Sequence, residues 1–275
     1  MLAGARSLLF APGNSERKLR KALASDAHGV IADLEDGVAP DERELARELV
    51  ERVLGESGPG PTRCLRINPP GPDFERDVAL SHALPGVIVV LPKATPEALV
   101  ALEGDAPVVA TVETPAGLEA ARRLAAHPRV IALMLGSLDL SAALGLRPRE
   151  DGLELLFARS ELVLASALAG VRAPFDGPRA EFRDHDGLQH DVDLAASLGL
   201  GGKACIHPDQ IAAVNAGFGP SEAQVRWAHA VLEEYEAAVR RGSGLTVVDG
   251  AMVDEPVVAR ARAVIANHGP GAARE

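Results

Sequence analysis

Short apolar runs rich in Val, Ile and Leu alternate along the chain with longer amphipathic segments. Continuous apolar runs are typical of strands buried on both faces, and amphipathic segments between them are typical of helices that cover a parallel sheet. The pattern predicts eight strands, at residues 7–12, 29–35, 63–68, 86–93, 107–114, 130–137, 172–177 and 202–208. It also predicts helices between the strands, the clearest at residues 14–24, 41–54, 114–127 and 154–170.

Eight such units over about 215 residues match the length of a (β/α)8 barrel. The alternative is a doubly wound open sheet, which usually has a glycine-rich phosphate-binding turn after its first strand. The sequence "FAPGNSERK" at that point does not contain such a turn. We therefore expect an α/β fold, with a (β/α)8 TIM barrel at residues 1–220.

The pattern changes after residue 220. A long amphipathic helix is expected at residues 221–242, followed by a glycine-rich turn and the segment "LTVVDGAMVDEPVVARARAVIANHG". This tail has no place in an eight-stranded barrel. We expect residues 221–275 to form a helical C-terminal extension, which either packs on its own barrel or acts as a lid that reaches a neighbouring subunit.

The composition is that of a globular chain, with 275 residues of which 47% are hydrophobic. No apolar run reaches the roughly 18 residues of a membrane span, and no secretory signal is recognisable, so a membrane partner is not expected. Cys64 and Cys205 lie in apolar, strand-like runs, which argues against a disulfide or zinc site and favours a cytoplasmic location. The net charge of −11 disfavours nucleic acid as a partner.

Positive charge is locally dense in "SERKLRKAL", which contains Arg17, Lys18, Arg20 and Lys21. A basic cluster on an acidic protein can mark a site for an anionic small molecule. Taken alone, the cluster fits a solvated helix face better.

Polar side chains stand at the end of nearly every predicted strand, where a barrel enzyme has its active site. Each of them alone could be a capping or loop residue, whereas the whole set favours a site. The residues are Asp33, Glu35, Asp36, Arg66, Asn68, Lys93, Glu113, Asp139, Asp176 and His207.

The segment "VIADLEDGVAP" places three acids at the end of a buried strand. Carboxylates this close repel one another and resist burial, so a metal, an arginine or solvent must balance them. Arg66 lies in the apolar strand "LRIN" and needs an acidic partner such as Glu35, Asp36 or Glu113. Two roles suit Arg66 equally well: a structural ion pair, or a cation that polarises a substrate oxygen.

Glu113 and Asp139 follow neighbouring strands, so their carboxylates can converge. Two oxygen ligands, completed by water and a chelating substrate, suit Mg²⁺, with Mn²⁺ as the next choice. Glu113 also directly precedes "TPAG", which opens a helix, so it could instead serve the helix dipole.

Seven motifs resemble, in order, those of the citrate lyase beta-subunit family, also called the CitE-like or HpcH/HpaI aldolase superfamily. The resemblance extends from Arg6 to about Ala261. It implies a barrel that assembles as a homotrimer or a hexamer and cleaves or forms a carbon–carbon bond in a hydroxyacyl thioester with Mg²⁺. The motifs are "RSLLFAPGNSERKLRKAL", "DLEDGVAPDERELAR", "LRIN", "LPKA", "VETPAGL", "GSLDLSAALG" and "GKACIHPDQIAAVN".

The resemblance also implies roles for individual residues. Glu113 and Asp139 match the magnesium ligands, and Arg66 matches the arginine that binds the carboxylate and oxygen of the substrate, beside Glu113. Phe10, Arg17 and Lys21 match the coenzyme A region.

Three further acids take their expected roles from the same resemblance. Asp254 matches a lid aspartate that completes the site of the neighbouring subunit and exchanges a proton with the substrate, although it also suits the start of a helix. Glu35 and Asp36 are expected to hold metal-bound water and orient Arg66. From the sequence pattern, Asp33 is expected to be structural because it alternates in facing with Leu34, and His207 because "IHPDQ" is typical of a rigid turn.

The function implied is that of a magnesium-dependent lyase acting on a citryl-, malyl- or citramalyl-CoA thioester. The products would be an acetyl thioester and a 2-oxoacid, namely oxaloacetate, glyoxylate or pyruvate. Two alternatives remain open on the same scaffold. One is a malate-synthase-like condensing enzyme or thioesterase, and the other is a citrate lyase subunit that acts on citryl-acyl-carrier protein.

Overall fold

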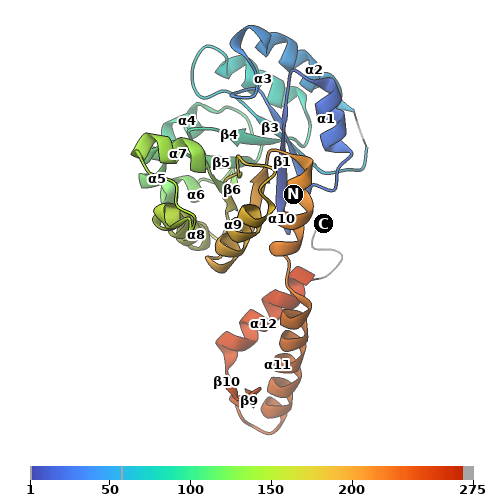
Figure 1. Ribbon diagram of the computed structural model, residues 1–275, viewed down its shortest axis with the longest axis vertical. Coiled ribbons are helices and arrows are strands. Elements are labelled where there is room, and N and C mark those ends of the chain that lie inside the picture. The colour runs from blue at the N-terminus through green and yellow to red at the C-terminus, as the bar shows by residue number, and fades with distance from the viewer. Residues whose placement is uncertain (1, 57, 269–275) are drawn as a thin grey trace. The chain divides into compact units, whose positions relative to one another are not determined.

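The structure is a computed structural model that describes residues 2–56 and 58–268. Eight parallel strands close into a barrel in chain order, with β8 returning to pair with β1 (Figure 1). The prediction of a (β/α)8 barrel is therefore confirmed. The strands are β1 (Ser7–Pro12), β2 (Gly29–Asp33), β3 (Thr62–Arg66), β4 (Ile88–Leu91), β5 (Val108–Val112), β6 (Val130–Leu135), β7 (Phe175–Asp176) and β8 (Gly202–Cys205).

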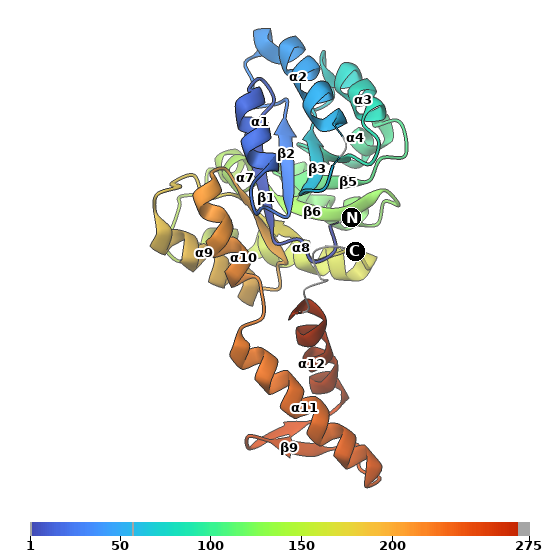
Figure 2. The same cartoon turned by 90° about the vertical axis from the view of Figure 1, so that its right-hand side faces the viewer.

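Helices follow the strands and cover the outside of the barrel, as α1, α2 and α3 do beside β1 to β3 in Figure 2. The helix expected at residues 114–127 is divided in two, because the backbone of Ala120 leaves helical geometry (φ −86°, ψ 2°). The barrel helices are α1 (Glu16–Leu23), α2 (Arg43–Gly55), α3 (Phe74–Ala83), α4 (Pro96–Ala101), α5 (Pro115–Glu119), α6 (Ala121–Ala125), α7 (Ser137–Leu144), α8 (Leu156–Ala169), α9 (His185–Ser197) and α10 (Ile211–Gly217).

Most of the strands are shorter than the sequence pattern predicts, because the polar residues expected at their C-terminal ends lie in the segments that follow the strands. β7 is reduced to Phe175 and Asp176. Pro174 directly precedes it, and a proline has no N–H to donate to a neighbouring strand.

Alternation along the strands separates two apolar clusters. One fills the barrel and includes Ile31, Cys64 and Val109, whereas the other lies between barrel and helices and includes Ala32, Leu65 and Ala110. Side chains two residues apart on a strand share a face. Asp33, Arg66 and Thr111 therefore continue the interior face towards the C-terminal mouth of the barrel.

The described residues from 219 onward form a second compact unit, distinct from the described residues up to 218. Its described part comprises α11 (Glu222–Arg240), the hairpin strands β9 (Thr246–Val248) and β10 (Ala251–Val253), and α12 (Glu255–His268). Its own core includes Val231, Val248, Val253 and Val258. Residues 269–275 of the expected extension lie outside the described residues.

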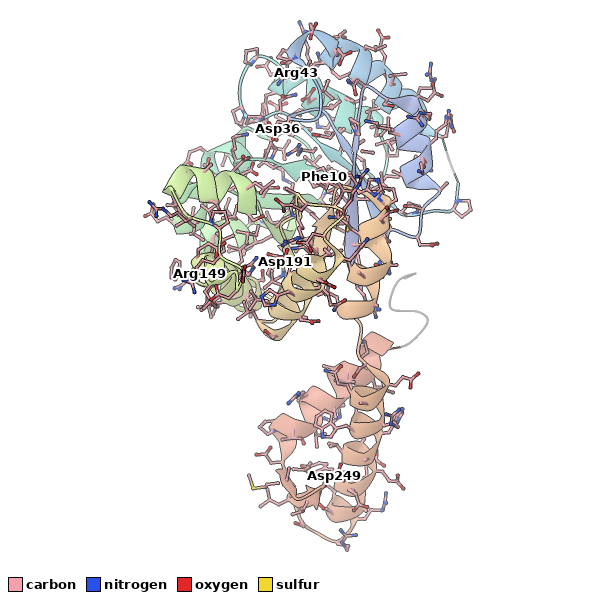
Figure 3. The ribbon with its side chains drawn as sticks, in the orientation of Figure 1. Phe10, Asp36, Arg43, Arg149, Asp191 and Asp249 are labelled. Carbon is pink, nitrogen blue, oxygen red and sulfur yellow. The ribbon has the colours of Figure 1, made fainter. Side chains whose placement is uncertain are left out.

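The expected helical extension also contains a hairpin, which was not predicted from the sequence. Asp249 (φ 49°) and Gly250 (φ 78°) form its turn, which Figure 3 shows in this unit. Asp-Gly is the pair that two-residue hairpin turns favour, since both positions require positive φ. None of the helices in the described part of the chain combines the length and hydropathy needed to cross a membrane.

Candidate active site

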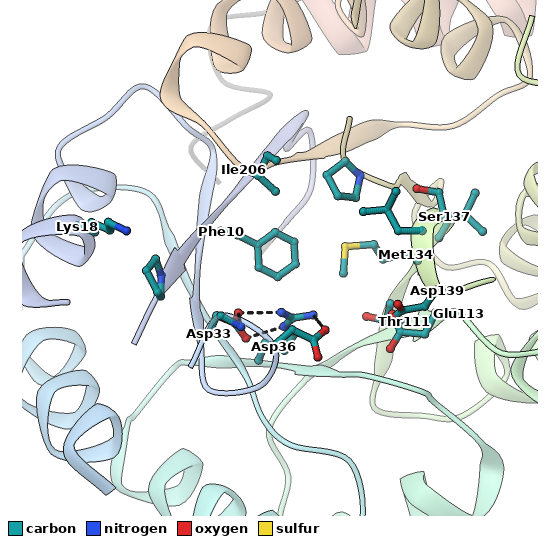
Figure 4. A pocket seen from close by; sticks show the side chains of 17 residues that line it. Phe10, Lys18, Asp33, Asp36, Thr111, Glu113, Met134, Ser137, Asp139 and Ile206 are labelled. Carbon is teal, nitrogen blue, oxygen red and sulfur yellow. Dashed lines mark hydrogen bonds and ion pairs between the residues drawn. The ribbon is translucent and has the colours of Figure 1, made fainter. Parts of the chain in front are cut away.

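A cavity of about 490 Å³ opens at the C-terminal ends of the barrel strands. Its volume falls in the range of small-molecule sites. In Figure 4, Asp33 and Asp36 lie across the cavity from Thr111, Glu113 and Asp139. The cavity therefore brings together the acids of the second, fifth and sixth strand ends.

Arg66 and Asp33 form the best-defined pair in the cavity. Arg66 donates from Nε to Oδ1 of Asp33 at 2.6 Å and from Nη2 to Oδ2 at 2.7 Å. The same carboxylate accepts the backbone N–H groups of Glu35 and Gly37, each at 2.9 Å. Asp33 thus holds both the arginine and the turn that follows β2.

Two further acids surround Arg66. Its Nη1 lies 3.1 Å from Oε2 of Glu35 and 3.4 Å from Oδ2 of Asp36. Its guanidinium also lies over the Phe10 ring, 4.9 Å from the centroid. Burial opposes the charge of Arg66, but the hydrogen bonds to Asp33 and the neighbouring acids raise its pKa above the usual value.

Glu35 is balanced by two cations. Its Oε1 accepts a hydrogen bond from Nζ of Lys93, while its Oε2 faces Arg66. Burial raises the pKa of Glu35, and the charge of Arg66 and the contact with Lys93 oppose that rise. An arginine and a lysine are therefore what balance the acids of "VIADLEDGVAP" within the described residues.

Glu113 and Asp139 form a second acidic pair. Oε1 of Glu113 accepts the backbone N–H of Lys93 at 2.7 Å. Burial raises the pKa of Glu113 to about 7; that hydrogen bond opposes the rise, and the charges of Glu35 and Asp139 add to it. Asp139 lies in the first turn of α7 and is exposed. Among the described residues its carboxylate has no hydrogen bond or ion pair.

These two carboxylates fit a divalent cation such as Mg²⁺. Gly136 makes room for Glu113, because a Cβ at residue 136 would overlap with Cβ and Oε2 of Glu113. No group of three or more potential metal ligands occurs in the described part of the chain. A cation held by Glu113 and Asp139 would therefore take its remaining oxygen ligands from water and substrate.

The basic helix α1 reaches the cavity through Lys18, which lines it together with Phe10. Arg17 and Lys21 are exposed and lie outside the cavity lining. Arg20 forms ion pairs with Glu16 at 2.9 Å and Glu56 at 2.6 Å. Lys18, which was not singled out from the sequence, is thus the cation of this helix that faces the site.

Two of the polar strand ends take structural positions instead. Asp176 is fully buried and contacts Arg159 of α8 at 3.0 Å and Lys203 of β8 at 2.8 Å. His207 caps a 3-10 turn by accepting the N–H of Asp209 at 3.2 Å, and it stacks on Phe182. Neither residue lines the cavity.

Asn68 is structural as well. It donates to the carbonyl of Leu34 at 2.9 Å and to Asp77 at 2.7 Å.

Asp254 precedes α12 in the second unit. Its Oδ1 accepts the N–H of Val257 at 3.4 Å, so it caps the helix. It belongs to the second unit and is not among the residues that line the cavity.

The fold and the cavity together define a barrel enzyme whose strand ends combine the mostly buried Arg66 with the carboxylates of Glu113 and Asp139. The family model described as HpcH/HpaI aldolase/citrate lyase matches residues 6–208. The chain belongs to this family.

Relatives with different activities match almost the whole chain. A (3S)-malyl-CoA thioesterase of Cereibacter sphaeroides is 36% identical over 267 residues, covering 95% of this chain and 93% of that protein. The citrate lyase subunit beta of Leuconostoc mesenteroides is 32% identical over 285 residues, covering 96% and 94%.

A solved structure has a similar fold over nearly its full length. It is the protein CitE from Mycobacterium tuberculosis in complex with magnesium, acetoacetate and coenzyme A. The TM-score is 0.84 at 32% identity, and the match covers 97% of this chain and 99% of that one.

Proposed function

We propose that the protein is a magnesium-dependent lyase that cleaves a carbon–carbon bond in a hydroxyacyl-CoA thioester. The products are a 2-oxoacid and an acetyl thioester. The observation that carries the proposal is the convergence of Arg66, Glu113 and Asp139 on one cavity at the strand ends. A family relative is crystallised with magnesium, a keto acid and coenzyme A, which supports the same ligand classes here.

Each part of the site has a step to perform in this reaction. Mg²⁺ held by Glu113 and Asp139 would supply Lewis acidity at the oxygen of the bond-breaking carbon. Arg66 binds the carboxylate of the acid portion and supports the same oxygen as its charge changes. Asp33 and Glu35 keep the guanidinium in place, since both contact it.

In cleavage, the substrate hydroxyl loses its proton to solvent as its oxygen becomes the carbonyl of the 2-oxoacid, and the acetyl thioester leaves as an enolate, which takes up a proton. Asp254, contributed by a neighbouring subunit, gives that proton in the cleavage direction and removes it in condensation. Its position at the start of α12 does not prevent this role, because a capping carboxylate retains a second oxygen.

The thioester carrier is coenzyme A, bound through Phe10 and the basic helix with Arg17, Lys18 and Lys21. Phe10 and Lys18 line the cavity, which supports this assignment. Citryl-, malyl- and citramalyl-CoA are the candidate substrates. An acyl-carrier protein is the alternative carrier, which the relative named as a citrate lyase subunit supports.

A thioesterase is the second candidate function, because a relative at 36% identity is named as a malyl-CoA thioesterase. The two reactions attack different bonds of one substrate. A lyase breaks the carbon–carbon bond and leaves the thioester intact, whereas a thioesterase hydrolyses the thioester and leaves the hydroxy acid intact.

We also propose a homotrimer or a hexamer of the chain in the cytoplasm. The exposed side chains of Leu245, Val247 and Met252 around the hairpin support an assembly that covers them. Cys64 and Cys205 are buried free thiols, which fits a reducing compartment.

The experiment follows the products of each thioester with Mg²⁺ and with a chelator. Equal release of acetyl-CoA and oxoacid, lost on chelation and in Asp139→Asn, supports the lyase. Free coenzyme A with intact hydroxy acid supports the thioesterase. If none of the three thioesters is converted, the proposal is wrong.

A further inference from the structure

Lys93 has an unusual backbone. Its φ is 45°, and among the described residues only Asp249 (φ 49°) shares a positive φ without being glycine. Asp249 lies in a hairpin turn that requires this conformation. Lys93 instead follows Pro92 in the turn after β4, at a position where glycine or asparagine is usual.

Both ends of Lys93 contact the site. Its backbone N–H donates to Oε1 of Glu113 at 2.7 Å, and its ammonium donates to Oε1 of Glu35. Left-handed backbone in a residue with a side chain is unfavourable and persists where the surroundings require it. Glycine would allow the N–H contact without this strain. The strained backbone is therefore explained by the contact that the lysine side chain makes.

The contacts form a continuous chain across the mouth of the barrel. Glu113 contacts Lys93, Lys93 contacts Glu35, Glu35 contacts Arg66, and Arg66 contacts Asp33. Within the described residues, Lys93 is the member that joins the cation-binding carboxylate to the arginine side of the cavity.

The ammonium also sets how Glu35 meets Arg66. The side chain of Glu35 is 4% exposed, whereas that of Lys93 is 40% exposed. With Oε1 occupied by Lys93, Glu35 presents only Oε2 to the guanidinium. Without Lys93, both oxygens of a buried carboxylate would compete with Asp33 for Arg66.

We propose that Lys93 is a positioning residue: through Glu35, its ammonium holds Arg66 in the orientation that binds the acid portion of the substrate. Its backbone N–H separately orients Glu113. This inference rests on the proposed lyase function. It predicts that the two contacts of Lys93 can be separated by substitution.

Lys93→Gly deletes the ammonium and keeps the N–H and the left-handed backbone. Lys93→Asn does the same with a side chain that tolerates this conformation, in case the glycine variant does not fold. Lys93→Arg keeps the charge. Asp249→Gly, at the other left-handed residue, is the matched control for removing a side chain from such a backbone.

Calorimetry then measures Mg²⁺ affinity alone and oxoacid affinity at saturating Mg²⁺, using pyruvate, glyoxylate and oxaloacetate. We expect Lys93→Gly to retain Mg²⁺ affinity within about twofold and to lose about tenfold in oxoacid affinity. Lys93→Arg should restore most of that loss, and Asp249→Gly should change neither affinity. In turnover, the loss should appear mainly in KM.

Three results are decisive. Wild-type oxoacid affinity in both Lys93→Gly and Lys93→Asn overturns the inference and leaves the lyase proposal standing. The inference is also overturned if Lys93→Arg loses as much oxoacid affinity as Lys93→Gly, because the positive charge at residue 93 would then not position Arg66. If the wild-type protein binds Mg²⁺ but no oxoacid, the proposed function itself fails.

Discussion

Asp33 and Arg66 are direct partners in the register of β2 and β3, and their side chains meet as a two-hydrogen-bond pair at the mouth of the barrel. The pair therefore stabilises the barrel sheet as well as forming part of the site. Asp33→Asn should lower the free energy of unfolding by about 3 kcal/mol, because it leaves a mostly buried arginine short of a charge partner. Denaturant titration measures this change.

The control for Asp33→Asn is Asp36→Asn. The Asp36 side chain is 60% exposed and lies 3.4 Å from Arg66, so its loss should change stability by no more than about 1 kcal/mol. If the two variants are equally stable, Asp33 is not the residue that anchors Arg66.

Glu35→Gln should separate activity from stability. Burial raises the pKa of Glu35, so its charge is unfavourable to the fold except through Arg66 and Lys93. The neutral variant should therefore keep a thermal midpoint close to that of the wild-type protein. Its turnover should fall about tenfold or more, because Arg66 and Lys93 lose their common partner. Unchanged kinetics would show that Glu35 does not position Arg66 for the reaction.

Gly136→Ala tests the space that Glu113 occupies. The added methyl group would overlap with the Glu113 side chain and displace its carboxylate. Mg²⁺ affinity, measured by calorimetry, should fall about tenfold or more. Gly55→Ala is the control, since a Cβ there meets nothing within 4 Å. Equal Mg²⁺ affinity in the two variants would place the cation away from Glu113.

The pKa of about 7 at Glu113 predicts a pH dependence of Mg²⁺ binding. A cation binds the ionised carboxylate, so affinity should rise with pH up to about 7 and then level off. For the cation-free protein, the free energy of unfolding changes with pH in the opposite direction. A folded pKa above the unfolded value of 4.5 means that the free energy of unfolding falls as pH rises from about 4.5 to 7. Glu113→Gln should lack this fall, and a wild-type slope in that variant would contradict the prediction.

Mixed oligomers test whether Asp254 acts on a neighbouring subunit. Arg66→Ala and Asp254→Asn should each be nearly inactive alone. If the two residues meet across subunits, mixing the variants under exchange conditions should restore activity in sites that combine both wild-type residues. Remixed Arg66→Ala alone is the control. No recovery, despite subunit exchange shown by mass spectrometry, would show that Asp254 does not act on a neighbouring subunit.

The barrel could be predicted because its signals are local. Apolar runs that alternate with amphipathic segments determine a parallel sheet, and polar residues at the strand ends mark its functional face. Arg66, Glu113 and Asp139 were recognised in this way, and the cavity brings them together.

Other features depend on three-dimensional contacts that the sequence pattern does not reveal. Asp33 was expected to be structural because it alternates with Leu34. That alternation is what turns its side chain inward to Arg66, so it holds the turn and the arginine together. Lys93 contacts Glu113 through its backbone, which residue type alone does not reveal. The hairpin was foreseeable, since "VVDGAMV" contains its Asp-Gly turn.

The cavity is lined by buried charged residues and by exposed apolar residues at its rim. Asp33 and Glu113 are buried, Arg66 is mostly buried, and the three are connected through Glu35 and Lys93, so altering one disturbs the others. Leu138 and Ile206 line the same cavity but are 55% and 42% exposed. A change of substrate preference should therefore be sought first at these rim residues, because their side chains take no part in the contacts that hold Arg66 and Glu113.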